Sequence, residues 1–161
     1  MTIAITPGEY RALAELRYRI RSFVREGDAK ARDAGLEPQQ YLILLAIRGL
    51  PDGVDATIRV LADRLVLKHH SVVELVDRLE QGGLVRRSRN RDDRRRVLVS
   101  LLPRGEKLLE EVARHRIGEL RSNGAALVAA IEALLEREPA VAKRRTVKAS
   151  RAKKTPKKKS G

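Results

Sequence analysis

The apolar residues of this chain follow a helical period over most of its length. Between residues 57 and 81, apolar side chains recur at steps of three and four in two short runs that a tight turn separates. After the glycine pair at 82–83, which suits a helix end because glycine accepts positive φ, the period changes from helical to alternating. Residues 84–87 and 97–101 are typical of strands that flank a hairpin tip at residues 90–94. This order predicts a winged helix-turn-helix.

Amphipathic helices are predicted on both sides of this segment. Thr6-Pro7-Gly8-Glu9 has the residues of a capping box with proline at the first helical position, so a long helix should begin there. Pro38 should open a second helix, which we expect at the buried centre because its apolar residues are so uniform: Tyr41, Leu42, Leu44, Leu45 and Ile47. After Pro103, one helix is expected to end at Ser122-Asn123-Gly124, and a last helix to follow.

These elements predict a mainly α protein with a small β-hairpin wing. A winged helix-turn-helix reader over residues 38–103 would be flanked by N- and C-terminal dimerisation helices over residues 7–34 and 103–137. The apolar stripes of the flanking helices have nothing large enough to cover them within one chain. A second copy would cover them through a two-fold axis and would place two recognition helices about one DNA turn apart. We therefore expect a homodimer.

Length and composition narrow the class of protein. The chain has 161 residues and no cysteine. This length predicts one folded domain over residues 1–139, and the lack of cysteine excludes disulfides and thiolate metal sites. Because the sequence has no leader pattern and no run of about eighteen apolar residues, we expect no membrane partner and a cytoplasmic, nucleoid-associated location.

The net charge of +14 is unevenly distributed. Residues 140–161 hold ten Lys or Arg and no acid, so residues 1–139 hold 25 basic and 21 acidic residues, or +4. With so few apolar side chains, the tail is expected to stay disordered until it meets an anion. It is predicted to bind DNA nonspecifically through Lys153, Lys154, Lys157, Lys158 and Lys159. Thr155-Pro156-Lys157-Lys158 resembles short elements of histone and nucleoid-protein tails, although a degraded or cloning-derived tail is the alternative.

The predicted wing is dense in arginine. Seven arginines stand between residues 86 and 96 against two aspartates. Such a density favours an anionic partner, and duplex DNA is the partner we expect. The alternative is a hairpin charged only for solubility, but such a hairpin would mix its signs. The predicted wing contacts are Arg86, Arg87, Arg89, Arg91, Arg94, Arg95 and Arg96, of which Arg94 and Arg95 are the best minor-groove candidates.

The second short helix of the reader supplies candidates for contacts with base edges. If Val72 is the centre of its buried face, His70, Glu74 and Asp77 point away from the core. The predicted DNA contacts here are Lys68, His69, His70, Ser71, Val73, Glu74 and Arg78. A solvated helix start is the alternative for the histidines. A metal is not expected, because adjacent helical residues diverge by about 100° and only His115 remains as a further histidine.

These residues resemble the MarR family of bacterial transcription regulators, over roughly residues 7–137. Asp93-Arg94-Arg95 and the alternating residues to Leu101 resemble the family's Asp-x-Arg wing, and LADRLVLKHHSVVELVDRLEQGGLVRR resembles its reader helices. The resemblance implies that Asp93 braces a wing arginine and that a small-molecule effector binds between the dimer helices and the reader. The chain's only aromatic residues are candidates for lining that pocket, with core packing as the alternative for each: Tyr10, Tyr18, Phe23 and Tyr41.

The chain departs from the family pattern at two residues. Leu102 stands where the family has threonine, and leucine cannot cap the helix that follows, a loss of about 1 kcal/mol where no other cap substitutes. Val66 stands where the family turn commonly has glycine, so the turn must avoid positive φ or bear strain. The lysine-rich tail also lies outside the family pattern.

The sequence therefore predicts a homodimeric, sequence-specific, double-stranded DNA-binding transcription regulator. We expect a repressor modulated by a small-molecule ligand, with no cofactor and no metal. The alternative is a nucleoid-associated protein that coats or bridges DNA with low sequence preference through its wing and tail. An interaction module without DNA function is disfavoured by the intact wing. An enzyme is not expected, because the sequence has no Gly-rich phosphate loop, activated nucleophile or distinct carboxylate cluster.

Overall fold

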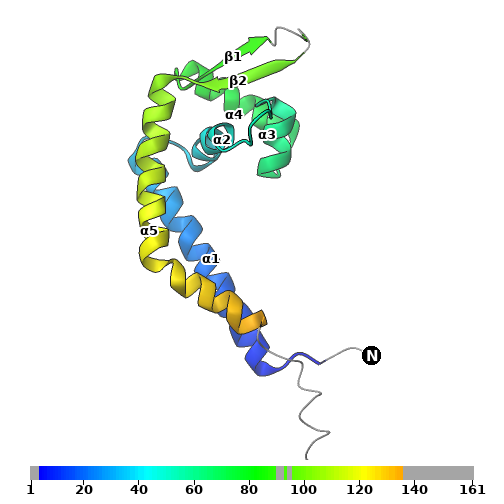
Figure 1. Ribbon diagram of the computed structural model, residues 1–161, viewed down its shortest axis with the longest axis vertical. Helices are drawn as coiled ribbons and strands as arrows, with labels where there is room; N and C mark the ends of the chain where they lie inside the picture. The colour runs from blue at the N-terminus through cyan, green and yellow to red at the C-terminus, as the bar shows by residue number, and fades with distance from the viewer. Residues whose placement is uncertain (1–3, 90–92, 94–95, 136–161) are drawn as a thin grey trace, which may run out of the picture. The chain divides into compact units, whose positions relative to one another are not determined.

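The computed structural model describes residues 4–89, 93 and 96–135 (Figure 1). Its fold is the predicted one, mainly α with a single antiparallel hairpin in the described residues. The described residues divide into two compact units, one within residues 22–122 and one made of residues 4–21 and 123–135. The elements are α1 (Pro7–Asp33), α2 (Pro38–Arg48), α3 (Ile58–Leu65), α4 (His69–Gln81), β1 (Val85–Arg89), β2 (Val97–Leu101) and α5 (Pro103–Leu135).

The core of the 22–122 unit is centred on α2, α3 and α4, with further buried residues from α1, the two strands and α5. The apolar stripe predicted for the second reader helix is buried on α4, and it meets the buried side of α3. Burying a large aliphatic side chain stabilises a fold by about 1.5–3 kcal/mol, so this cluster fixes the two helices against each other. Its members on α3 and α4 are Leu61, Ala62, Val72, Leu75, Val76 and Leu79.

Helix α2 is less buried than predicted. Tyr41, Ile43 and Leu44 lie in the core, but Leu42 is 43% and Leu45 is 40% exposed. The prediction that α2 lies at the buried centre is confirmed, since α2 contacts α3, α4 and β2, but it was wrong for Leu42 and Leu45. Its other side keeps apolar surface open.

The predicted capping box begins α1. The Thr6 backbone N–H donates to Oε2 of Glu9 at 2.6 Å, and the Glu9 N–H donates to Oγ1 of Thr6 at 3.2 Å. Two backbone donors that lack partners inside the helix are thus satisfied. Helix α1 then ends at Asp33, one residue before the predicted end.

The turn between α3 and α4 bears backbone strain. Val66 has φ 54° and ψ 41°, in the left-handed region, and is the one non-glycine residue with positive φ in the described chain. Its side chain is 91% exposed, so no packing offsets the crowding of Cβ against the backbone. The turn is closed by the Leu67 N–H, which donates to the Ala62 carbonyl at 3.0 Å. Of the two possibilities that the sequence left open for Val66, the structure has the strained one.

The wing, which we define as β1, β2 and the residues that join them, pairs in antiparallel register from Val85↔Leu101 to Arg89↔Val97. The segment before α3 extends this sheet, because the Val99 N–H donates to the Ala56 carbonyl at 2.8 Å and Thr57 bridges Leu98. The wing is thereby joined to the helix-turn-helix at two places: β1 follows α4 along the chain, and β2 pairs with the segment before α3.

Helix α5 runs unbroken from Pro103 to Leu135. The predicted break at residues 122–124 was wrong: a glycine costs about 1 kcal/mol in a helix, which the rest of a long helix can offset, and the Ser122 hydroxyl donates back to the Gly118 carbonyl at 3.1 Å. The helix begins at Pro103 as expected, although Leu102 offers no side-chain cap. The Leu102 N–H donates instead to the Leu84 carbonyl at 2.9 Å.

Candidate nucleic-acid interface

The first turn of α4 is the exposed end of the predicted recognition helix. Lys68 occupies the N-cap position without a side-chain cap hydrogen bond, and His69 and His70 follow it into solvent. The unsatisfied N–H groups of a helix start carry a partial positive charge, which the Lys68 ammonium increases. This end of α4 therefore attracts anions and offers two imidazoles as donors or acceptors.

The rest of the outward face of α4 carries both an acidic and a basic side chain. Glu74 and Arg78 are exposed and pair with each other at 3.7 Å, while Ser71 and Val73 are half-buried at its margins. An exposed pair one helical turn apart is worth only a few tenths of a kcal/mol, so either partner is available to another ligand.

Arg87 of β1 lies against α4 rather than toward solvent. Its Nη1 is 2.6 Å from Oδ1 of Asp77 and 2.8 Å from Oε2 of Glu80, and its Nη2 donates to the Val73 carbonyl at 3.3 Å. Its backbone N–H donates to Oε1 of Glu80 at 2.8 Å. We call these residues, Arg87 with Asp77 and Glu80, the Arg87 clamp. The prediction that Arg87 contacts DNA does not fit this geometry, because its guanidinium already holds the wing to the recognition helix.

The clamp also affects the ionisation of Glu80. The pKa of the Glu80 carboxyl lies below its ordinary value, first because it accepts the Arg87 backbone N–H and then because it accepts the guanidinium. Glu80 is therefore ionised at neutral pH.

The other described arginines of the wing differ in their exposure and in their hydrogen-bond and ion-pair partners. Arg86 projects from the opposite face of β1 to Arg87, is exposed, and its Nε donates to Ser100 Oγ at 3.3 Å. Arg89 is exposed at the end of β1. The Nη2 of Arg96 is 3.1 Å from Asp55, an ion pair that ties β2 to the segment before α3.

The tip of the wing is described only in part. The Asp93 carbonyl accepts the Arg96 N–H at 2.9 Å. Three of the predicted DNA contacts, Arg91, Arg94 and Arg95, lie outside the described residues, as do the five tail lysines: Lys153, Lys154, Lys157, Lys158 and Lys159.

The four aromatic residues predicted to line a ligand pocket have different surroundings. Tyr10 and Tyr18 are exposed on α1 in one unit. In the other unit Tyr41 is buried, which raises its pKa, and the Phe23 ring stacks on the guanidinium of Arg116 at 3.8 Å. The geometry of Phe23 and Tyr41 favours core packing, which was the alternative.

Arg116 is a buried cation that the sequence analysis missed. It is 8% exposed, pairs with Glu119 and donates to the Phe23 carbonyl at 2.8 Å. Its guanidinium needs Gly27 opposite, where a Cβ would lie 2.9 Å away. The available signal was its position seven residues after Leu109 and four after Val112, on the buried side of α5.

Two further features bear on function. Among the described residues, no cluster of three or more His, Asp or Glu side chains is arranged to hold a metal ion. Nor does any helix in that part of the chain have the length and hydrophobicity needed to cross a membrane.

Comparison with known proteins identifies relatives of the reader. Residues 34–96 match the profile of the MarR family. The chain is 37% identical over 67 residues to the uncharacterized HTH-type transcriptional regulator YsmB of Bacillus subtilis, which covers 42% of this chain and 46% of that protein. It is 38% identical over 81 residues to the HTH-type transcriptional regulator FarR of Neisseria gonorrhoeae, which covers 49% and 52%. The chain thus spans about half the length of these curated relatives.

A solved structure extends the likeness to the flanking helices. A MarR family protein from Bacillus stearothermophilus is 25% identical, with a TM-score of 0.60 over 91% of this chain and 96% of that chain. Residues 34–96 thus match the MarR family, and the chain shares the fold of a solved MarR family protein.

Proposed function

We propose that the protein is a homodimeric transcription regulator that binds specific sites on double-stranded DNA. The observation that carries the proposal is the Arg87 clamp, which joins the second half of α4, a helix with an exposed and cationic start, to a wing that carries further arginines. Recognition helix and wing are thereby held as one surface. The names of the two curated relatives, both HTH-type transcriptional regulators, support the same function.

In this proposal α4 enters the major groove. His69, His70 and Ser71 reach base edges, since imidazoles and a hydroxyl can donate or accept there. Glu74 accepts from cytosine once it leaves Arg78, and Val73 makes apolar contact. Lys68 and Arg78 bind phosphates.

The wing supplies affinity rather than sequence preference. Arg86 and Arg89 contact phosphates, and Arg91, Arg94 and Arg95 enter the adjacent minor groove, whose negative potential attracts guanidinium. Asp93 braces the tip, and Arg96 has a part in holding the wing through Asp55. The tail lysines add nonspecific affinity.

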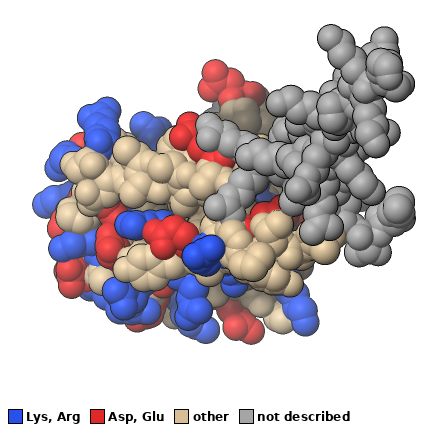
Figure 2. Space-filling view, turned by 90° about the horizontal axis from the view of Figure 1, so that it is seen from below, with Lys and Arg blue, Asp and Glu red and all other residues tan. Residues whose placement is uncertain are grey.

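The exposed apolar residues of α1 and α5 support the homodimer. Figure 2 shows uncharged surface exposed among charged side chains on the face seen from below. Scattered apolar residues are ordinary on a protein surface, but a repeated set on two long helices suits burial against a second copy. The exposed members are Tyr10, Leu13, Tyr18, Ile20 and Val24 on α1, and Ile117, Leu120, Val128, Ile131 and Leu135 on α5.

We further propose that the dimer represses transcription and that a small ligand modulates its affinity for DNA. A protein seated on a promoter blocks access to it, and a ligand that prefers one arrangement of the dimer changes the fraction competent to bind. The nucleoid-coating alternative is not favoured, because the curated relatives are named as regulators.

Selection of bound duplexes from a random library tests the proposal. We expect one enriched two-fold-symmetric sequence, whose affinity exceeds that of random duplex by about 10³ or more. Equal affinity for enriched and random duplex would contradict sequence-specific regulation. The variant His70→Ala should change the enriched sequence, whereas Arg86→Ala should weaken binding to every duplex.

A further inference from the structure

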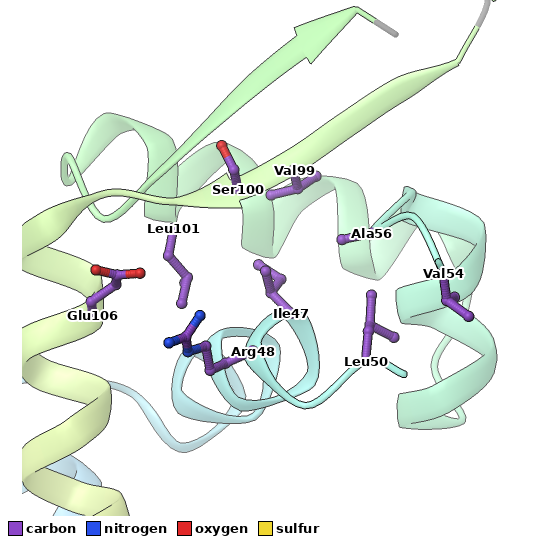
Figure 3. A pocket seen from close by; sticks show the side chains of 9 residues that line it. All are labelled: Ile47, Arg48, Leu50, Val54, Ala56, Val99, Ser100, Leu101 and Glu106. Atoms are coloured by element: carbon purple, nitrogen blue, oxygen red, sulfur yellow. The ribbon is translucent and has the colours of Figure 1, made fainter. Parts of the chain in front are cut away.

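A hollow lies between the end of α2, the segment before α3, strand β2 and the first turn of α5 (Figure 3). Its volume is about 330 Å³, within the range of sites that hold small organic molecules. All of its walls belong to the 22–122 unit. Neither Phe23 nor Tyr41 lines it, and the Phe23 ring stacks on Arg116 instead.

The hollow has an apolar floor and two charged groups of opposite sign. Ile47, Leu50, Val99 and Leu101 supply apolar surface, while Arg48 from α2 and Glu106 from α5 project from different walls (Figure 3). Apolar walls with a few placed polar groups are the usual composition of a ligand site.

Arg48 and Glu106 are exposed, and they differ from the paired arginines of this unit. Within the described chain neither side chain has a hydrogen bond or an ion pair, whereas Arg87, Arg96 and Arg116 are all held by carboxylates. A cation and an anion that face one hollow without meeting leave space for a ligand that carries both complementary charges.

We propose that this hollow binds a small zwitterion with an apolar body, such as an α-amino acid with an aliphatic or aromatic side chain. The planar Arg48 guanidinium would bind the ligand carboxylate through two parallel hydrogen bonds, and the Glu106 carboxylate would bind its ammonium. The ligand side chain would lie on Leu101 and Ile47. A ligand with one charge would leave the opposite protein charge without a partner.

The position of the hollow gives such a ligand influence over the reader. Its walls include Ala56 and Val99, whose backbone hydrogen bond joins the wing to the segment before α3, and the first turn of α5. A bound zwitterion would link α2 to α5 across these elements and favour one position of the wing. This regulatory role rests on the proposed function, whereas binding itself does not.

Calorimetric titration of the full-length protein without DNA tests the site. The probes are L-leucine, L-methionine and L-phenylalanine, compared with 4-methylpentanoate and 3-methylbutylamine, each of which keeps one charge of leucine. We expect at least one amino acid to bind and the single-charge analogues of leucine to bind about tenfold or more weakly than leucine, the loss of one charged hydrogen-bonded contact.

Variants identify the residues responsible. Arg48→Gln and Glu106→Gln should each weaken amino-acid binding about tenfold or more, and Arg48→Lys, which keeps the charge, should weaken it less. Lys107→Gln, an exposed neighbour of Glu106, is the matched control and should bind as the unaltered protein does. Circular dichroism confirms that each variant is folded.

Two results would overturn the inference: no binding of any of the three amino acids at millimolar concentration, or equal binding by Arg48→Gln, Glu106→Gln and the control. A DNA titration with and without the bound amino acid then separates the two proposals. Loss of specific DNA binding with intact amino-acid binding would contradict the regulator function and leave the site standing.

Discussion

Replacing Arg87 with glutamine should show whether this residue positions the wing against α4 or contacts DNA itself. The change removes the guanidinium that lies 2.6 Å from Asp77 and 2.8 Å from Glu80. It leaves in place the backbone hydrogen bond from residue 87 to Glu80, so the strand can still form. What is lost is the ionic link between β1 and α4.

The size of the effect follows from the exposure of the three side chains. Arg87 is 24% exposed, but the Asp77 and Glu80 side chains are 46% and 38% exposed, so solvent screens both pairs. A charged hydrogen bond is worth about 1.5–3 kcal/mol when buried, and an exposed ion pair about 0.2–1 kcal/mol. Two half-screened pairs therefore give a loss of about 1–2 kcal/mol. At about 2–4 °C per kcal/mol for a chain of this size, Tm should fall by about 2–8 °C.

The DNA assay distinguishes a positioning residue from a phosphate contact. Affinity for the selected site should fall in Arg87→Gln, because α4 and the wing no longer hold one geometry, but the slope of log K against log salt should not change. Loss of one phosphate contact would lower that slope by about 0.9. The matched control is Arg86→Gln, an exposed neighbour, which should lower the slope and leave Tm unchanged. A lowered slope with unchanged Tm in Arg87→Gln would refute the clamp.

Three further changes test the local physical chemistry. Val66→Gly should raise the free energy of unfolding by about 0.5–1 kcal/mol, because the left-handed strain of about 1–2 kcal/mol exceeds the entropy cost of glycine; a lower Tm would contradict this. Gly105→Ala should destabilise the fold by about 1–3 kcal/mol, since the added Cβ would clash with the Leu84 carbonyl. Gly118→Ala, with open space around it, should stabilise the fold by about 0.4–1 kcal/mol. Similar effects at the two sites would contradict the close approach at Gly105. Because the folded-state pKa of Glu80 is lowered, its contribution is present above the ordinary value of 4.5 and lost as pH falls through the folded pKa. Urea unfolding should therefore show the difference between the protein and Glu80→Gln shrinking below about pH 4.5, and a difference that grows there would reverse the sign.

The fold of the reader was predictable because its signals are local. The spacing of Val72, Leu75, Val76 and Leu79 defines one face of one helix, and that face is buried as expected. The exposure of Leu42 was not predictable in the same way, because every neighbour along α2 is apolar and only the packing of other elements selects which side is covered.

The candidate site was predictable in composition but not in geometry. The density of wing arginines indicates an anionic partner, yet it does not reveal that Asp77 and Glu80, on a preceding helix, lie opposite Arg87. Such a pairing depends on the angle between β1 and α4, which cannot be inferred from the periodicity of the sequence. That Arg48 and Glu106 line one hollow could not be predicted for the same kind of reason, since they are 58 residues apart in sequence.

The central claim is that a dimer of this chain recognises a specific DNA sequence. Analytical ultracentrifugation of the protein with a labelled duplex carrying the selected site, in the presence of excess random duplex, measures stoichiometry and specificity together. We expect two protein chains for each labelled duplex, with random duplex unable to compete until it is present at about 10³-fold excess. One chain per duplex, or displacement by an equal amount of random duplex, would contradict it.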